Sequence, residues 1–111
     1  MTHRRVYTLW KHPLFQETVR RLLNHPDVEW LGSHSEYKLG KRKIDALRPD
    51  VIIIEQESEG VENAQDVMGT ASWDVSVVSL SLSDNVLNLY SHRVQTVGHA
   101  DDLLRIVLDK T

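Results

Sequence analysis

Side chains with reactive groups stand where three apolar runs of the chain end. Lys11 directly follows Trp10, the last residue of the first run. Glu55 closes the second run and Ser81 closes the third. If these runs are parallel strands, their carboxyl ends meet at one edge of the sheet, where function collects in such proteins. Lys11 and Glu55 are therefore predicted to form a salt bridge at this edge.

The other reactive side chains form no known catalytic or metal-binding pattern. The chain has six histidines, but no two of them stand four residues apart, the helical spacing typical of a zinc site. It has no cysteine, which excludes disulfides, thiolate metal sites and cysteine nucleophiles. The segment after the first run offers no Ser, Thr or Gly to hold a flavin phosphate. We therefore expect no enzyme activity, no cofactor and no metal.

The composition predicts one folded domain, residues 1–111. Hydrophobic residues make up 41% of the chain and charged residues 26%, which suits a single packed core. The N-terminal apolar run is too short for a signal sequence or a membrane span, so a cytoplasmic location without membrane contact is expected. The net charge of −3 argues against direct binding to nucleic acid. A single basic cluster contains Lys38, Lys41, Arg42 and Lys43.

Apolar runs alternate with amphipathic stretches, a pattern typical of a parallel sheet with helices on both faces. The run Val51 to Ile54 is β-branched throughout, as in a central strand that is buried on both faces. Pro13 suits the first turn of a helix that ends before the turn at 24–27. The other predicted strands are 6–10, 28–31 and 75–81, and the other predicted helices are 35–47, 61–68 and 101–110.

A hairpin is predicted between the last of these strands and the C-terminal helix. The segments Val86 to Tyr90 and Arg93 to Val97 follow a turn and carry residues that suit strands better than a helix. Strand side chains alternate between two faces, so some of the apolar ones must point outward. Leu87, Leu89 and Tyr90 are therefore candidates for a partner surface.

Two segments, VYTLWKHPLFQETVRRLLNHPDVEWLGS and ALRPDVIIIE, resemble receiver domains of two-component response regulators that carry a helix-turn-helix output domain. The similarity runs over residues 5–60. It implies a flavodoxin-like fold with a doubly wound, five-stranded parallel sheet, in which an extra strand or the predicted hairpin replaces the family's fourth helix. In that family two acidic residues that hold Mg²⁺ stand directly before His-Pro-Leu. Here Trp10 and Lys11 occupy these two positions.

The resemblance also implies roles for two further residues. Glu55 stands at the position of the phosphoacceptor aspartate, and Ser81 at that of the switch Ser or Thr. The family's lysine has no counterpart around Thr96, and the loop Gln56 to Gly60 is short and lacks proline. Phosphoryl transfer to a carboxylate needs a divalent cation with oxygen ligands, which the Trp10 and Lys11 side chains do not supply. In place of the metal, the Trp10 ring is expected to cover the partly buried pocket of Lys11 and Glu55 as an apolar plug.

The chain is therefore predicted to be a degenerate receiver, a pseudo-receiver that cannot be phosphorylated. Its expected role is in signal transduction or transcription regulation, through contact with a regulatory protein partner and with homodimerisation as one option. The alternative is a nucleic-acid or small-ligand binding protein on the same α/β scaffold. For the basic cluster around Arg42, any binding to nucleic acid should be weak and salt-sensitive.

Overall fold

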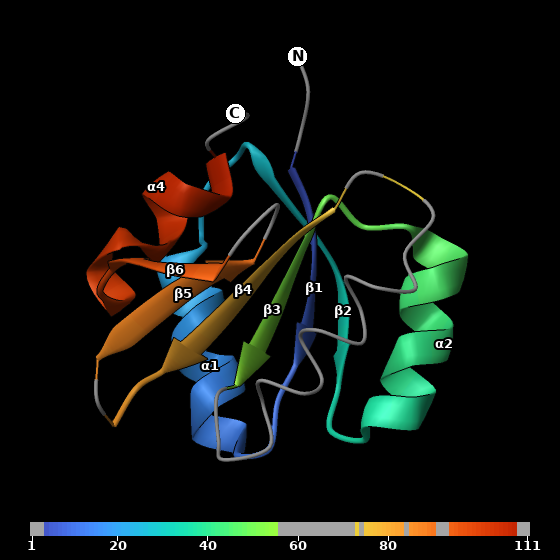
Figure 1. The fold of residues 1–111 in the computed structure, drawn as a ribbon. Helices are drawn as coiled ribbons and strands as arrows, with labels where there is room; N and C mark the ends of the chain where they lie inside the picture. The colour runs from blue at the N-terminus through green and yellow to red at the C-terminus, as the bar shows by residue number, and fades with distance from the viewer. Residues whose placement is uncertain (1–3, 56–72, 74, 84, 91–93, 109–111) are drawn as a thin grey trace.

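The computed structural model describes residues 4–55, 73, 75–83, 85–90 and 94–108, with the side chains of Tyr90, 94–98 and Asp101 left out. They form an α/β fold in which helices cover both faces of one mostly parallel, six-stranded sheet (Figure 1). The strands lie in the order β2-β1-β3-β4-β5-β6. The predicted helix at 61–68 and the loop Gln56 to Gly60 lie outside the described residues.

The first four strands are parallel to one another and occupy the segments that the sequence predicts. They are β1 (Arg4–Leu9), β2 (Val28–His34), β3 (Val51–Glu55) and β4 (Ser76–Ser81). In β3, Val51 to Ile54 are at most 3% exposed, as expected of a central strand. The order of these four strands is compatible with a flavodoxin-like fold.

The last two strands form the predicted hairpin. They are β5 (Val86–Tyr90), antiparallel to β4, and β6 (Val94–Gly98), antiparallel to β5. Because β6 is antiparallel to β5, it runs in the same direction as β1 to β4, so five of the six strands share one direction. The added strand β5 is antiparallel and lies between β4 and β6. Only residues 82–85 separate β4 from β5, whereas a parallel connection needs a dozen or more residues to cross over.

Two apolar clusters fix the helices to the sheet. The helices are α1 (Pro13–Leu22), α2 (Tyr37–Leu47) and α4 (Leu103–Leu108), the last preceded by the 3₁₀ turn η1 (Ala100–Asp102). One cluster joins α1 and α4 to one face, through Val6, Phe15, Val19, Leu23, Val51, Ile53, Val78, Leu80, Leu87, Leu103 and Val107. The other joins α2 to the opposite face, through Tyr7, Leu9, Ile44, Ile52, Ile54, Val75 and Val77. Burial of these side chains supplies the main drive for folding.

Hydrogen bonds close the amino end of the sheet. The Asp50 carboxylate accepts the Arg5 backbone N–H at 3.0 Å, and the Asp50 N–H donates to the Arg5 carbonyl at 2.9 Å. The Arg5 guanidinium donates to the carbonyls of Leu47 at 2.8 Å and Arg48 at 3.0 Å, where α2 ends. These bonds satisfy carbonyl groups that a helix end leaves without partners.

Each outer strand of the sheet contains one residue that has no paired residue on the neighbouring strand. In β2 the pairing with β1 passes from Trp30 to Gly32 and skips Leu31. Gly32 has a φ of 151°, which other residues rarely adopt. In β6 the pairing with β5 passes from Gly98 to Thr96, with the irregularity between Leu87 and Asn88 on β5. Both outer strands therefore depart from regular pairing.

Candidate functional site

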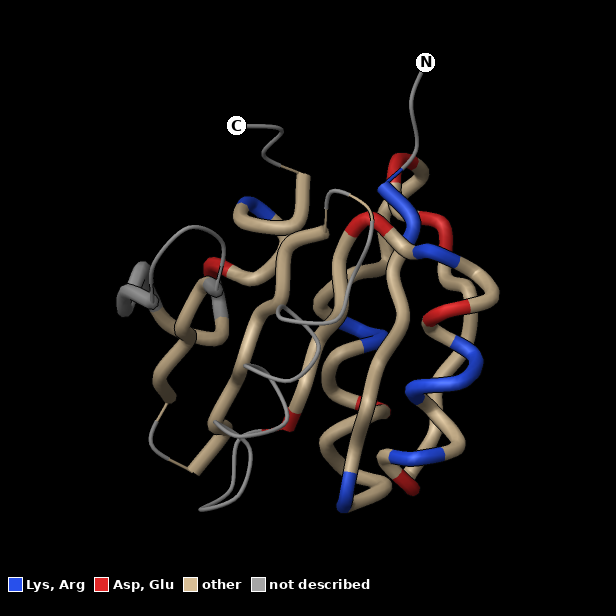
Figure 2. Tube along the Cα trace, turned by 45° about the vertical axis from the view of Figure 1, so that its right-hand side comes forward, with Lys and Arg blue, Asp and Glu red and all other residues tan. Residues whose placement is uncertain are grey.

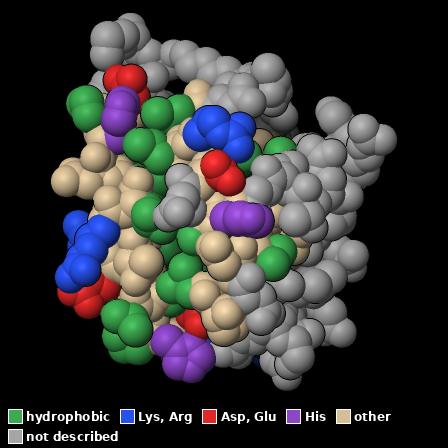
Figure 3. All heavy atoms as spheres, turned by 90° about the vertical axis from the view of Figure 1, so that its left-hand side faces the viewer, with side chains coloured by type: hydrophobic (Ala, Val, Ile, Leu, Met, Phe, Trp, Pro, Cys, Tyr) green, Lys and Arg blue, Asp and Glu red, His purple; other side chains and the backbone are tan. Residues whose placement is uncertain are grey.

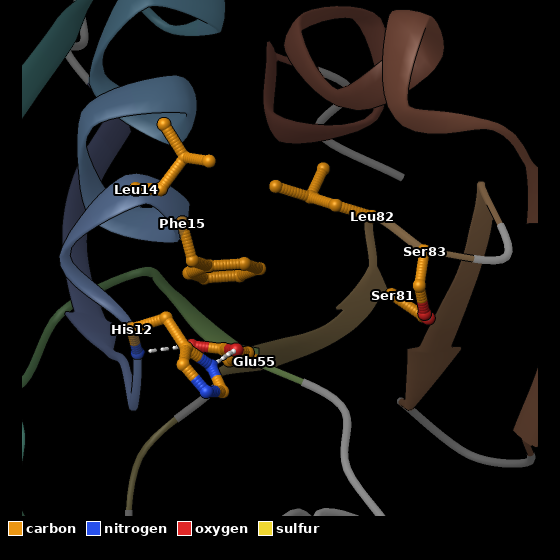
Figure 4. A pocket seen from close by; sticks show the side chains of 7 residues that line it. All are labelled: His12, Leu14, Phe15, Glu55, Ser81, Leu82 and Ser83. Atoms are coloured by element: carbon orange, nitrogen blue, oxygen red, sulfur yellow. Dashed lines mark hydrogen bonds and ion pairs between the residues drawn. The ribbon is translucent and has the colours of Figure 1, made fainter.

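A cleft of about 270 Å³ opens where β3 and β4 end and α1 begins. It is lined by His12, Leu14, Phe15, Glu55, Ser81, Leu82 and Ser83. Figure 4 shows Phe15 and Leu82 pointing toward one another, with His12 and Glu55 at one end and the two serine hydroxyls on the opposite side. The cleft thus combines apolar walls with polar groups, as ligand-binding pockets commonly do.

Glu55 is held at this end of the sheet by the loop that connects β1 to α1. Its Oε1 atom accepts the backbone N–H groups of Lys11 at 2.7 Å and His12 at 2.9 Å. Its Oε2 atom contacts Nδ1 of the His12 imidazole at 2.5 Å. The Glu55 side chain is 11% exposed, and the His12 side chain, which lies over it, is 65% exposed. Three donors from two adjacent residues therefore converge on one carboxylate.

These donors favour the charged form of the carboxylate. Burial, the largest single influence on the pKa of Glu55, raises it. The His12 side chain, the backbone N–H groups of Lys11 and His12, and the charge of His12 together outweigh burial and lower the pKa below the ordinary value of 4.5. Glu55 therefore remains ionised at neutral pH, at the start of α1, where the helix dipole also favours a negative charge.

The prediction that the Lys11 side chain forms a salt bridge with Glu55 is wrong. The backbone N–H of Lys11 binds Glu55, and the ion-pair partner of Glu55 among the described residues is His12. Lys11 itself is exposed. The prediction considered side-chain charges only, whereas a loop that passes beside a carboxylate can bind it through the main chain.

Trp10 lies at the start of the same loop and is partly buried. It packs against the apolar cluster on the α1 and α4 face. Its indole N–H is buried and has no hydrogen-bond partner in the described part of the chain. With Lys11 and Glu55, Trp10 also lines a second cavity of about 20 Å³, which has room for about one water molecule. The ring therefore fills space beside Glu55, whereas its polar atom adds no contact there.

Ser81 lies in the same cleft as Glu55, so the structure brings these two predicted residues together. Ser81 is 6% exposed, and its Oγ atom lies 3.2 Å from Oγ of Ser83. The sequence indicated no role for His12 or Ser83. The position of His12 directly before a helix-starting proline was the available signal, because the first turn of a helix presents donors to an anion.

The predicted partner surface on the hairpin is not supported at Leu87. That side chain is 0% exposed and belongs to the core on the α1 and α4 face, so it is closed to a partner. Leu89 is partly buried against the same cluster. The Tyr90 side chain lies outside the described residues. Leu87 and Leu89 point to the same face because they are two residues apart on one strand.

In the part of the chain that the structure describes, no three His, Cys, Asp or Glu side chains come together as a set that could hold a metal ion. His12 and Glu55 form a pair only. Among the described helices, none is long and apolar enough to cross a membrane. No protein-family model matches the sequence, and no curated protein matches it.

Proposed function

We propose that this protein is a receiver-like signalling module of flavodoxin-like topology that cannot be phosphorylated and acts by binding a regulatory protein. The observation that carries the proposal is the state of Glu55. In the receiver family the equivalent position holds an aspartate that is free to accept a phosphoryl group. Here the carboxylate is bound by two backbone N–H groups and an imidazole.

The residues beside Glu55 support the same proposal. A phosphoryl group on a carboxylate is transferred with the help of a divalent cation, which needs oxygen ligands. Trp10 offers an apolar ring, and Lys11 offers a cation that repels a metal ion. His12 adds a third nitrogen-bearing side chain at 65% exposure. The pocket thus lacks the metal ligands that phosphorylation of its carboxylate would need, and we infer that phosphorylation does not control it.

The first test is incubation of the purified protein with acetyl phosphate and Mg²⁺, followed by measurement of the intact mass. We expect no phosphoryl adduct. An acid-labile adduct at Glu55 would overturn the proposal. Capture of a protein partner should in turn be unaffected by acetyl phosphate or by a chelator of Mg²⁺, since neither alters the pocket. A partner that binds only after phosphorylation would also contradict it.

A variant with the acidic residues of a receiver tests whether these positions can form a metal-binding pocket. The substitutions Trp10→Asp, Lys11→Asp and Glu55→Asp together restore acids at all three positions. We expect Mg²⁺ to raise the melting temperature of this variant and to leave that of the wild type unchanged. The matched control carries Trp10→Asn, Lys11→Asn and Glu55→Asn, which replace each aspartate by a side chain of similar shape without charge. Equal responses of the variant and its control to Mg²⁺ would show that these positions do not form a receiver-type metal pocket.

A further inference from the structure

The outward face of α2 carries basic side chains that form no ion pair with a described carboxylate, Lys41 excepted. Lys38, Arg42 and Lys43 are exposed on this helix, and Figure 2 shows the basic positions along its length. The helix is anchored on its other side by Ile44, which is 0% exposed, and by Gly40, which is buried. The core therefore places no demand on the residues that face outward.

Lys41 differs from the other basic residues of α2. Its ammonium lies 3.1 Å and 3.2 Å from the two carboxylate oxygens of Asp45, and its side chain is only 18% exposed. This contact neutralises Lys41 together with Asp45, the one acid within the helix. Across the described residues, no carboxylate forms an ion pair with Lys38, Arg42 or Lys43. Three positive charges on this face therefore have no carboxylate partner among the residues that the structure describes.

An apolar side chain lies among these charges. Leu39 is 42% exposed, and only one other large hydrophobic side chain in the described part of the chain, Leu14, is also exposed. On a helix, residues three and four apart are neighbours, so Leu39 adjoins both Arg42 and Lys43. We call Lys38, Leu39, Arg42 and Lys43 the basic stripe.

The basic stripe is unfavourable for the isolated domain. Lys38 and Arg42 stand at i and i+4, where like charges destabilise a helix by a few tenths of a kcal/mol. The chain as a whole has a net charge of −3, so general basicity does not account for the stripe. The other side of the molecule, where α1 and α4 cover the sheet, shows charges of both signs around a band of hydrophobic side chains (Figure 3).

We infer that the basic stripe docks an acidic segment of a protein partner, with an apolar residue of that segment resting on Leu39. The inference rests on the proposed function as a protein-binding module and names the surface and the charge of the partner. Lys38 and Arg42 are separated by about 6 Å along the helix axis. Acids at i and i+4 of a partner helix match that spacing, as do acids at alternate positions of an extended segment, about 7 Å apart.

A nucleic acid fits this surface less well than an acidic protein segment. Its backbone presents a continuous row of phosphates, whereas the stripe offers three cations within little more than one helical turn. A phosphate backbone also gives Leu39 no apolar contact. The net charge of −3 further opposes the approach of a polyanion.

The test measures binding of a labelled peptide that carries glutamates at i and i+4 around a leucine. The wild type should bind this peptide, and binding should weaken as salt rises from about 50 to 200 mM. The same peptide with glutamine in place of glutamate should not bind. The double variant Arg42→Glu and Lys43→Glu should bind at least about tenfold more weakly, because two attractions become repulsions.

A matched control reverses two charges on the other face of the sheet. Arg20→Glu and Arg21→Glu change two exposed arginines of α1 and should leave peptide binding within about twofold of the wild type. Leu39→Ser should weaken binding about threefold without changing its salt dependence. Circular dichroism confirms that each variant is folded.

Equal loss of binding in both double variants would overturn the inference, because the effect would then follow net charge and not the stripe. Tighter binding of a DNA duplex than of the acidic peptide, sensitive to the same substitutions, would overturn it in favour of nucleic acid. Neither result depends on phosphorylation. An adduct at Glu55 after acetyl phosphate treatment overturns the proposed function through a separate measurement.

Discussion

Asp50 stands at the amino end of β3 and Glu55 at its carboxyl end, and both carboxylates accept backbone N–H groups from β1 or the loop after it. The Asp50 carboxylate accepts the backbone N–H of Arg5, and the guanidinium of the same Arg5 donates to the Leu47 carbonyl at the end of α2. At Glu55, the donors come from exposed residues beside a cleft of about 270 Å³. The same interaction therefore stabilises the fold at one end and defines an accessible site at the other.

Removal of the Asp50 carboxylate should have the larger effect on stability. Asp50→Ala leaves the partly buried N–H of Arg5 without its partner, and we expect the free energy of unfolding to fall by about 2 kcal/mol. Urea denaturation measures this change. Asp45→Ala is the control, since that exposed carboxylate pairs with Lys41 on the helix surface and should cost at most about 0.5 kcal/mol. Equal losses of unfolding free energy in the two variants would mean that the Asp50 carboxylate contributes no more to stability than an exposed carboxylate on the helix surface.

Removal of the Glu55 carboxylate should cost less, about 1 kcal/mol, because water can reach the N–H groups of Lys11 and His12. Glu55→Ala deletes a group equivalent to acetate. Acetate in the buffer should therefore raise the melting temperature of Glu55→Ala more than chloride does at equal ionic strength. Asp50→Ala provides the comparison, since Asp50 does not line the cleft. The same response to acetate in both variants would contradict a specific anion site at the β1 to α1 loop.

The smallest expected effect is on the pH dependence of stability. The folded protein lowers the pKa of Glu55 below 4.5, so its carboxylate contributes stability above that pH. The contribution is lost as the pH falls through the lowered pKa of the folded state. Urea midpoints of the wild type and Glu55→Gln should therefore differ most above pH 4.5 and converge as the pH falls below that value. A difference that grows on acidification would mean that the pKa of Glu55 is raised in the folded protein.

Much of the fold could be predicted from the sequence because local patterns specify it. The β-branched run Val51 to Ile54 has no good alternative to a buried strand, and Pro13 marks the start of α1. The hairpin was predicted from strand-forming residues after a turn. The prediction left open whether one extra strand or a hairpin follows β4. The short link 82–85 makes β5 antiparallel to β4, and β6 then returns to the direction of the first four strands.

The site was harder to predict because its contacts depend on the main chain and on register. Glu55 and Ser81 were placed at one edge correctly, since strand ends follow from strand boundaries. Sequence patterns do not show that the N–H groups of Lys11 and His12 turn toward a carboxylate. Side chains along β5 were expected to alternate between the two faces, but the sequence does not show which of them face the core. Leu87 was therefore assigned to the outer surface, whereas it faces the core.

The irregular pairing of β2 and β6 has a consequence for how this protein behaves at high concentration. A regular outer strand is a template on which a second chain can add in register and start a growing fibre. In both outer strands the row of N–H and C=O groups is interrupted by one unmatched residue, which also increases the local twist. Fibrous self-assembly is thus disfavoured at both borders of the sheet, which suits the proposed recognition of a partner through side chains such as Arg42 on α2.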